Sequence, residues 1–282
     1  MSAVSTTIRS GVARGGIELR QTVTNVLDLW NYFFPTVLLV GTVFFMRDAT
    51  VPGTDLSLGA RTLPSTLGMG LAFAGLLTVA TQLVTDREDG TLLRAKATPN
   101  GMAGYLVGKL VLVGGMAAIN FVLQIVPCLF IVDGLRVDAT GWLTLCWLLP
   151  LGFAATIPLG AVFGSLLDNP RNIGLLILPV GGLVAISGIF YPISSMPGWL
   201  QGVAQGFPIY WLGLGMRSVF LPDGLAAVEL GHSWQHPETF GVLLLWAVLG
   251  LLLAPIVLRR MSRRESGSAV AARREKAMAR VG

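Results

Sequence analysis

Charged side chains are scarce in this sequence. Only 12% of its 282 residues are Asp, Glu, Lys or Arg, against about 25% in soluble domains, while 53% are hydrophobic and the mean hydropathy is +0.70. So few charges cannot coat the surface of an ordinary soluble globule, and so much apolar surface excludes disorder and a coiled coil. The composition therefore predicts an integral membrane protein.

Cysteine and histidine are almost absent, which limits the chemistry available. Cys128 and Cys146 lie in apolar runs, so a disulfide framework is excluded and buried thiols are expected. His232 and His236 alone cannot complete a zinc site, and no Ser-His-Asp set is suggested. We expect no catalytic residue, no metal site and no cofactor site in this chain.

A phosphate-binding loop is missing too. The nearest match, Gly104 to Leu110, has the wrong glycine spacing and Leu where a Ser or Thr must reach Mg²⁺. If the protein uses ATP, another chain must bind ATP and Mg²⁺. A nucleic-acid partner is not expected either, because the basic residues flank apolar spans instead of lining a soluble face.

Long apolar runs are what the sequence has instead. A membrane helix needs about 20 mostly apolar residues, and the pattern predicts an all-α protein with six transmembrane helices. Residues 1–28 would precede these spans as a cytoplasmic N-terminus, and residues 259–282 would follow them as a basic cytoplasmic tail. The predicted spans, together covering 29–258, are 29–46, 63–84, 110–132, 142–167, 173–190 and 240–258.

The distribution of Lys and Arg predicts the orientation. With six spans, sixteen of the 20 Lys and Arg residues lie on the side of the termini and four lie on the other side. Cytoplasmic segments carry the excess of Lys and Arg. We therefore expect a multi-pass protein of the plasma membrane with both termini in the cytoplasm and its surface in contact with membrane lipid.

Residues 173–216 carry no charge and could form two full spans, which would make seven. Seven spans would place the Arg-rich tail outside, against the charge rule. Proline and glycine also interrupt the segment after Phe190. We therefore predict a re-entrant helical hairpin over 191–221, with one short helix near 197–206 and a second near 209–220, and with Trp199, Tyr210 and Trp211 as interface anchors.

Two segments on the cytoplasmic side have helical patterns. Apolar residues at helical spacing predict an amphipathic interfacial helix over 15–29. Between spans two and three, Thr85 and Glu88 suggest a capping box, with Arg94 and Lys96 in the last turn and Pro99 beyond it. This pattern predicts a short helix at the cytoplasmic face, which could dock a partner or be a solvated connector.

The spans contain almost no ionisable side chain, which disfavours a carrier with a proton relay. Among their few polar residues, Asn120 and Gln124 are four apart and share one face of the third span. Interhelical hydrogen bonding is the favoured role for this pair, and a polar substrate pathway is the alternative.

Three segments of the sequence carry further motifs. The first is Arg87-Glu88-Asp89-Gly90-Thr91-Leu92-Leu93-Arg94 with Ala97-Thr98-Pro99 and Gly108-Lys109-Leu110, the second runs from Gly188 to Pro192 and from Met196 to Leu200, and the third runs from Phe207-Pro208 to Arg217. In this order the three segments resemble the permease subunits of ABC exporters of the type-2 membrane family, which includes bacterial drug-resistance exporters. The third segment departs from the family pattern at Phe207, where Asn is usual.

The resemblance implies roles for these segments. Residues 86–96 would form the coupling helix that sits in a groove of an ABC ATPase subunit, and 15–29 would form the connecting helix. Two ATPase copies would serve a pair made of this permease and a second copy or a related permease. The implied ATPase-coupling residues are Arg87, Glu88, Asp89, Gly90, Thr91, Leu92 and Arg94, and the implied residues of a re-entrant gate are Pro192, Met196, Pro197, Trp199 and Arg217.

The sequence thus favours a transport subunit, not an enzyme, in an ATP-driven exporter of amphipathic drugs or lipid-like molecules. Two alternatives remain open. One is a channel or secondary carrier that does not use ATP, and the other is a membrane enzyme that modifies lipids, for which the chain offers only Asp86, Glu88 and Asp89 as acidic groups.

Overall fold

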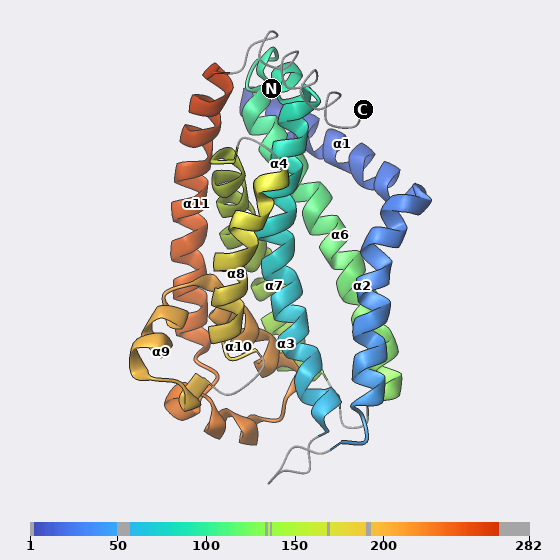
Figure 1. Ribbon diagram of the computed structural model, residues 1–282, viewed down its shortest axis with the longest axis vertical. Coiled ribbons are helices and arrows are strands. Elements are labelled where there is room, and N and C mark those ends of the chain that lie inside the picture. Colours follow the sequence, from blue (N-terminus) through green and yellow to red (C-terminus); the bar gives the residue numbers. More distant parts are fainter. Residues whose placement is uncertain are drawn as a thin grey trace.

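A computed structural model describes residues 3–49, 57–132, 135, 137–167, 170–189 and 193–264, and the described chain is helical without strands (Figure 1). The prediction of an all-α membrane protein is confirmed. In chain order the helices are α1 (Ala3–Thr24), α2 (Val26–Phe45), α3 (Leu58–Phe73), η1 (Ala74–Thr78), α4 (Val79–Glu88), α5 (Thr91–Lys96), α6 (Gly101–Ile131), α7 (Ala139–Ser165), η2 (Pro170–Ile173), α8 (Gly174–Ile186), η3 (Ile193–Ser195), α9 (Gly198–Gln205), α10 (Pro208–Phe220), η4 (Asp223–Val228), η5 (Leu230–His232) and α11 (His236–Arg264).

Four helical rods in the described part are long and apolar enough to cross a membrane: 58–88, 101–131, 139–165 and 236–261. The first of these rods joins α3 and α4 through η1, a π-helical segment. Two shorter apolar helices cover Thr36–Phe45 and Gly174–Ile186. That all six cross the membrane, with the bounds given above, stays a prediction.

The bundle has two distinct ends (Figure 1). At one end lie α1, the end of α4 and the last turns of α11, and at the other lie α9, α10 and the start of α3. The segment that joins α4 to α6 therefore lies at the same end as α1 and the end of α11. We call this the α5 end, and we call the opposite end the α10 end.

Helix α10 forms the centre of the main hydrophobic core. Its Leu212, Leu214 and Met216 side chains are fully buried. It approaches α3 so closely that a Cβ on Gly68 would lie 2.8 Å from the Cα of Gly213. Small residues at a helix crossing allow this approach, so α10 is built into the bundle and does not lie on its surface.

The two helices predicted near 197–206 and 209–220 are confirmed as α9 and α10. Pro208 begins α10 because a proline at the first helical position loses no hydrogen bond. The assignment of Tyr210 and Trp211 as interface anchors is wrong, because both side chains are buried in the core. Trp199 is 70% exposed. The depth of this hairpin in the membrane stays a prediction.

The amphipathic pattern over 15–29 does not form one continuous helix. Helix α1 ends at Thr24, and the Asn25 side-chain oxygen accepts a hydrogen bond from the Leu27 backbone N–H, at 3.0 Å, so that Asn25 starts α2. Val26, Leu27 and Trp30 therefore belong to α2, and all three are exposed. The sequence pattern is misleading here because the apolar spacing continues across the break.

Helix α1 packs against α6 through glycines on both helices. A Cβ on Gly11 would lie 2.7 Å from the carbonyl oxygen of Gly104, and a Cβ on Gly15 would collide with the carbonyl oxygen of Gly108. Each pair is spaced four residues apart, the small-xxx-small pattern that lets two helix backbones approach. Gly104 and Gly108, the two glycines of the rejected phosphate-loop match, thus belong to a helix–helix contact.

This contact predicts opposite effects at adjacent glycines. Gly15→Ala forces the α1 and α6 backbones apart and should lower the free energy of unfolding by about 1–3 kcal/mol. Gly16→Ala should raise it by up to about 1 kcal/mol, because a Cβ there meets no atom within 4 Å and alanine favours the helix. Denaturant unfolding in detergent micelles, followed by tryptophan fluorescence, measures both. Equal effects of the same sign would contradict this packing.

Candidate functional site

The segment after α4 is divided by Gly90. This glycine has φ of 79°, a left-handed conformation that is cheap only for glycine. The prediction that Thr85 to Asp89 form the first turn of a short helix is wrong. Asp86 and Glu88 lie in the last turn of α4, because the membrane helix continues to Glu88.

Helix α5 starts after this break. The Asp89 carboxylate accepts a hydrogen bond from the Thr91 backbone N–H at 2.7 Å, and Arg94 donates to the Thr91 hydroxyl at 2.8 Å. The short helix is therefore Thr91–Lys96, shorter than predicted but with Arg94 and Lys96 in its last turn as expected.

One face of α5 is anchored in the bundle. Leu92 is 1% exposed and Ala95 is also buried, in a hydrophobic cluster with Tyr105 of α6 and with Leu258 and Met261 of α11. Leu92 thus contacts the protein's own core, and it is not a surface residue available to a partner. This packing fixes the position of α5 relative to α6 and α11.

The other predicted coupling residues divide into exposed and anchoring groups. Asp89 and Arg94 are exposed, and Glu88 and Thr91 are partly exposed. Arg87 extends toward the end of α7, where its guanidinium donates to the carbonyl oxygen of Leu167 at 3.1 Å. The structure therefore presents only part of the predicted set to the outside.

A groove of about 340 Å³ lies beside α5. It runs between α1 and the segment that joins α5 to α6, and Arg14 and Arg94 line its two sides. The exposed residues Lys96 to Asn100 continue this surface. We call the exposed side of α5 together with this groove the α5 surface.

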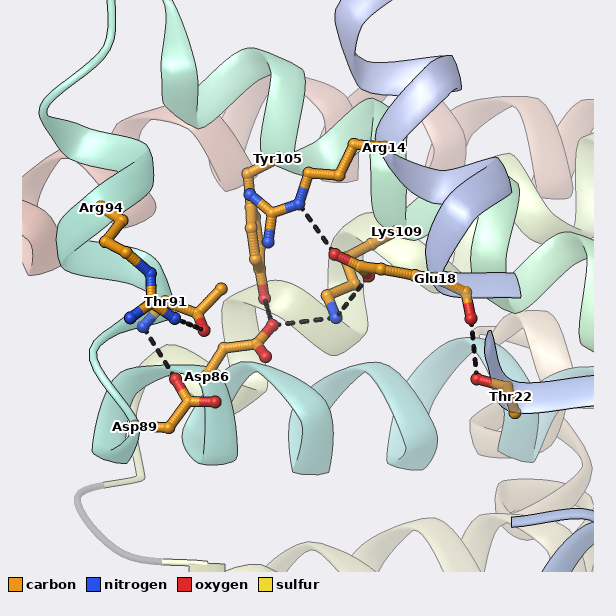
Figure 2. A network of polar contacts seen from close by, with 9 residues as sticks. All are labelled: Arg14, Glu18, Thr22, Asp86, Asp89, Thr91, Arg94, Tyr105 and Lys109. Carbon is orange, nitrogen blue, oxygen red and sulfur yellow. Dashed lines mark hydrogen bonds and ion pairs between the residues drawn. The ribbon is translucent and has the colours of Figure 1, made fainter. Parts of the chain in front are cut away.

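Directly beneath the α5 surface, a lysine joins three helices (Figure 2). The Lys109 ammonium of α6 lies 2.9 Å from Oδ2 of Asp86 in α4 and 3.4 Å from Oε2 of Glu18 in α1. The Lys109 side chain is 6% exposed. Burial of a lone ammonium is very costly, so the two carboxylates are what allow it to lie there.

Two further side chains complete this network. The Tyr105 hydroxyl donates to Oδ2 of Asp86 at 2.7 Å, and Nε of Arg14 donates to Oε1 of Glu18 at 2.8 Å (Figure 2). Two cations therefore face two carboxylates, and no charge in the network lacks an opposite charge. We call Arg14, Glu18, Asp86, Tyr105 and Lys109 the α1–α4–α6 network.

Sequence reasoning missed this network. It began the third span at residue 110 and so left Lys109 outside the span, whereas α6 begins at Gly101 and buries Lys109 within the helix. The available signal was the spacing, since Arg14 and Glu18, and likewise Tyr105 and Lys109, are four residues apart on one helix face. Which partners they would meet depends on how α1 crosses α6, and the sequence does not show that.

A second ion pair lies at the α10 end. Arg217 of α10 pairs bidentately with Glu229, with Nε to Oε1 at 2.7 Å and Nη2 to Oε2 at 3.0 Å. Its Nη1 also donates to the carbonyl oxygen of Gly188, beyond the end of α8, at 3.4 Å. Arg217 is buried, so this pair ties the hairpin to the chain before and after it.

The other predicted gate residues lie around α9. The Gln201 side chain donates to the carbonyl oxygen of Met196 at 2.8 Å, and Pro197 directly precedes the helix. Met196 is partly buried against the main core. Pro192 lies outside the described residues, and a gating role for the set stays a prediction.

Asn120 and Gln124 lie near the middle of α6. The Thr36 hydroxyl of α2 donates a hydrogen bond to the Asn120 side-chain oxygen, which joins α2 to α6. Gln124 shares two cavities with Asn120. A pathway role for the pair stays a prediction.

The two histidines do not share one helix. His232 lies in η5 with φ of 51°, and His236 begins α11. Within the described ranges, no group of three or more His, Cys, Asp or Glu side chains is placed to hold a metal ion.

Comparison with known families identifies the class of the protein. Residues 48–257 match the ABC-2 family transporter proteins, and this match covers well over half of the chain. The chain therefore belongs to the ABC-2 family transporter proteins. It is a membrane-embedded transmembrane subunit of an ABC transporter, a class that works with an ATPase partner. A comparison with curated proteins finds no match.

The α1–α4–α6 network predicts a strong energetic coupling between its members. Lys109→Met should lower the free energy of unfolding by about 3–5 kcal/mol, because it leaves Asp86 and Glu18 close together without their shared cation. Lys96→Met, the matched change at an exposed lysine, should cost less than about 0.5 kcal/mol.

A double-mutant cycle separates the pair from other effects of each change. Combining Lys109→Met with Asp86→Asn should give a coupling energy of about 1–3 kcal/mol. Additive costs in the cycle, measured by denaturant unfolding in micelles, would show that the two side chains do not interact.

Proposed function

We propose that this chain is the membrane subunit of an exporter, and that an ABC ATPase subunit docks on the α5 surface. The proposal rests on one observation: one side of α5 is buried in the protein and the other side is exposed. Leu92 and Ala95 fix one side to the core, while Arg94 is exposed on the opposite side and Lys96 is exposed at the end of the helix. A partner that moves α5 must therefore move the helices behind it.

The orientation of the chain supports this docking site. Sixteen of the 20 Lys and Arg residues lie in segments on the side of the termini, which favours a cytoplasmic location for the α5 end. The ATPase would then bind ATP and Mg²⁺ in the cytoplasm of a cell bounded by the plasma membrane. The permease itself would hold no nucleotide.

The expected assembly has two ATPase subunits and two permeases. The second permease would be another copy of this chain or a related chain. Closure of the ATPases on ATP would push on both α5 surfaces and tilt the permease halves between inward-facing and outward-facing states. Outward transport of amphipathic drugs or lipid-like molecules rests on the resemblance to exporters and on the apolar character of the spans.

Charge reversal on α5 tests the docking site. Arg94→Glu combined with Lys96→Glu should reduce copurification of the cognate ABC ATPase about tenfold, which corresponds to roughly 1.4 kcal/mol, because both side chains are exposed at the proposed docking surface. ATP hydrolysis by the reconstituted complex should fall with it. Affinity purification of the co-expressed subunits and phosphate release measure the two effects.

Arg47→Glu is the matched control. Arg47 is exposed after α2, beside Asp48, and the same charge reversal there should leave the complex intact. Leu92→Arg is not a suitable test of docking, because it would bury a charge in the permease core. Unchanged copurification of the α5 double variant would count against docking at this surface.

A further inference from the structure

Helix α11 runs along one edge of the bundle and packs on α7 (Figure 1). Its buried residues recur every three or four positions, which places them on one face of the helix. One of them, Gly250, approaches α7 so closely that a Cβ there would lie 3.0 Å from Cβ of Pro158. The opposite face is therefore turned away from the protein. The buried residues are Leu243, Ala247, Gly250, Ala254, Leu258 and Met261.

The opposite face of α11 carries large apolar side chains for much of its length. Leu245, Leu249, Leu252 and Ile256 follow one another at intervals of three or four residues, and they are 39–63% exposed. We call these four residues the apolar stripe. At a rise of 1.5 Å per residue, the stripe is about 17 Å long. On a rod that is apolar and long enough to cross a membrane, such a face lies in the hydrocarbon of the bilayer or against another membrane protein.

The same face changes to arginine at the α5 end. Arg259, Arg260 and Arg263 are exposed, and they continue the spacing of the apolar stripe beyond Ile256. No Asp or Glu occurs in residues 239–264, so α11 itself supplies no carboxylate to this group. We call the three arginines the basic stripe.

The position of the basic stripe along the helix matches that of lipid headgroups. At 1.5 Å per residue, Arg259 and Arg260 lie about 5–6 Å beyond Ile256 along the helix axis. The polar layer on each side of a bilayer is about 5–8 Å thick. With Ile256 at the edge of the hydrocarbon, these side chains therefore reach the phosphates. Arginine suits this depth because its guanidinium binds a phosphate through two parallel hydrogen bonds.

The charge of the basic stripe also distinguishes a lipid from a second copy of the chain. Two copies related by a two-fold axis along the membrane normal present the same face to each other at the same depth. Contact through this face of α11 would place three arginines opposite three arginines, which repel one another. A phospholipid with a net negative charge instead brings the opposite charge to the arginines, and its acyl chains cover the apolar stripe.

We propose that this face of α11 binds an anionic phospholipid, with the phosphate held between Arg260 and Arg263 and the acyl chains along the apolar stripe. These two arginines are three residues apart, so they are neighbours on the helix surface. The proposal identifies a side of the permease that lipid covers and a second copy does not. It does not depend on the docking of an ATPase, since it concerns only α11 and the membrane.

Photolabelling of the full chain in lipid vesicles tests the headgroup preference. The vesicles contain equal amounts of phosphatidylglycerol and phosphatidylcholine, and one of the two carries a diazirine on an acyl chain. Phosphatidylglycerol should label α11 peptides at least about fivefold more than phosphatidylcholine, the factor that corresponds to about 1 kcal/mol for one arginine. Arg260→Gln combined with Arg263→Gln should reduce this ratio at least about threefold. Mass spectrometry of peptic peptides measures the ratio.

Two control variants separate the charge of the basic stripe from other effects. Arg260→Lys combined with Arg263→Lys keeps both positive charges and should retain most of the preference. Arg47→Gln removes an exposed arginine beside the start of α3, at the α10 end, and should leave the ratio at α11 unchanged. Because Arg260 and Arg263 are exposed, the glutamine and lysine variants should unfold at the same denaturant concentration as the unaltered chain.

Cysteine cross-linking tests whether a second copy covers this face instead. Ile256→Cys is introduced into a chain whose two native cysteines are replaced by alanine, and a short bis-maleimide is added to the vesicles. Ile256 is 63% exposed, so the new thiol is accessible to the reagent unless another protein covers it. A face covered by lipid should give no cross-linked dimer.

Three results would overturn the proposal: equal labelling by the two lipids, a preference that stays at full strength in the glutamine variant, or a cross-linked dimer in high yield. None of them bears on the α5 surface, because the vesicles contain no ATPase. Loss of ATPase docking in the α5 variant, with the lipid preference unchanged, would affect only the docking proposal.

Discussion

The buried ammonium of Lys109 is the interaction on which the α5 end of the molecule depends. It lies between Asp86 and Glu18, and without it two carboxylates from different helices would share an apolar region. The Lys109 side chain is 6% exposed, whereas those of Asp86 and Glu18 are 16% and 25% exposed, so the buried ammonium is stabilised mainly by the two carboxylates. As a consequence, α1, α4 and α6 are held together as one unit directly behind α5.

Each end of the bundle contains buried ion pairs, but the pairs have different structural roles at the two ends. At the α10 end, the buried pair of Arg217 and Glu229 closes a hairpin whose helix α10 fills the main core. At the α5 end, the ion network joins helices that are distant in the chain. Between the two ends the helices meet through glycine and alanine, as where Gly164 of α7 approaches Ala80 of α4. A displacement of α5 would therefore be expected to move α1, α4 and α6 together.

Much of the fold could be predicted from the sequence because composition and apolar run length are local properties. The apolar runs, the two helices after Pro197 and the exposed end of α5 follow from them. Contacts across helices could not be predicted in this way. The sequence analysis left Lys109 outside the third span and counted Leu92 among the coupling residues, because burial depends on which helices face each segment.

Turn geometry was the second source of error. Thr85 and Glu88 fit a capping box, but a membrane helix that already continues through them needs no new N-terminus. Gly90, which the sequence analysis named only as a coupling residue, is the residue that ends one helix and permits the next. The two cavities that Asn120 and Gln124 share could not be predicted either, because residues of α2, α3, α6 and α7 line them together.

The most direct test of the α1–α4–α6 unit is the distance between α1 and α5. Spin labels at Ala13 and at Ala97, both exposed, would report it by pulsed electron resonance in liposomes, with the two native cysteines replaced by alanine. The ion network predicts one narrow distance distribution, which Asp86→Asn broadens while helical content stays unchanged. An equally narrow distribution in that variant would show that the charges do not hold α1 to the bundle.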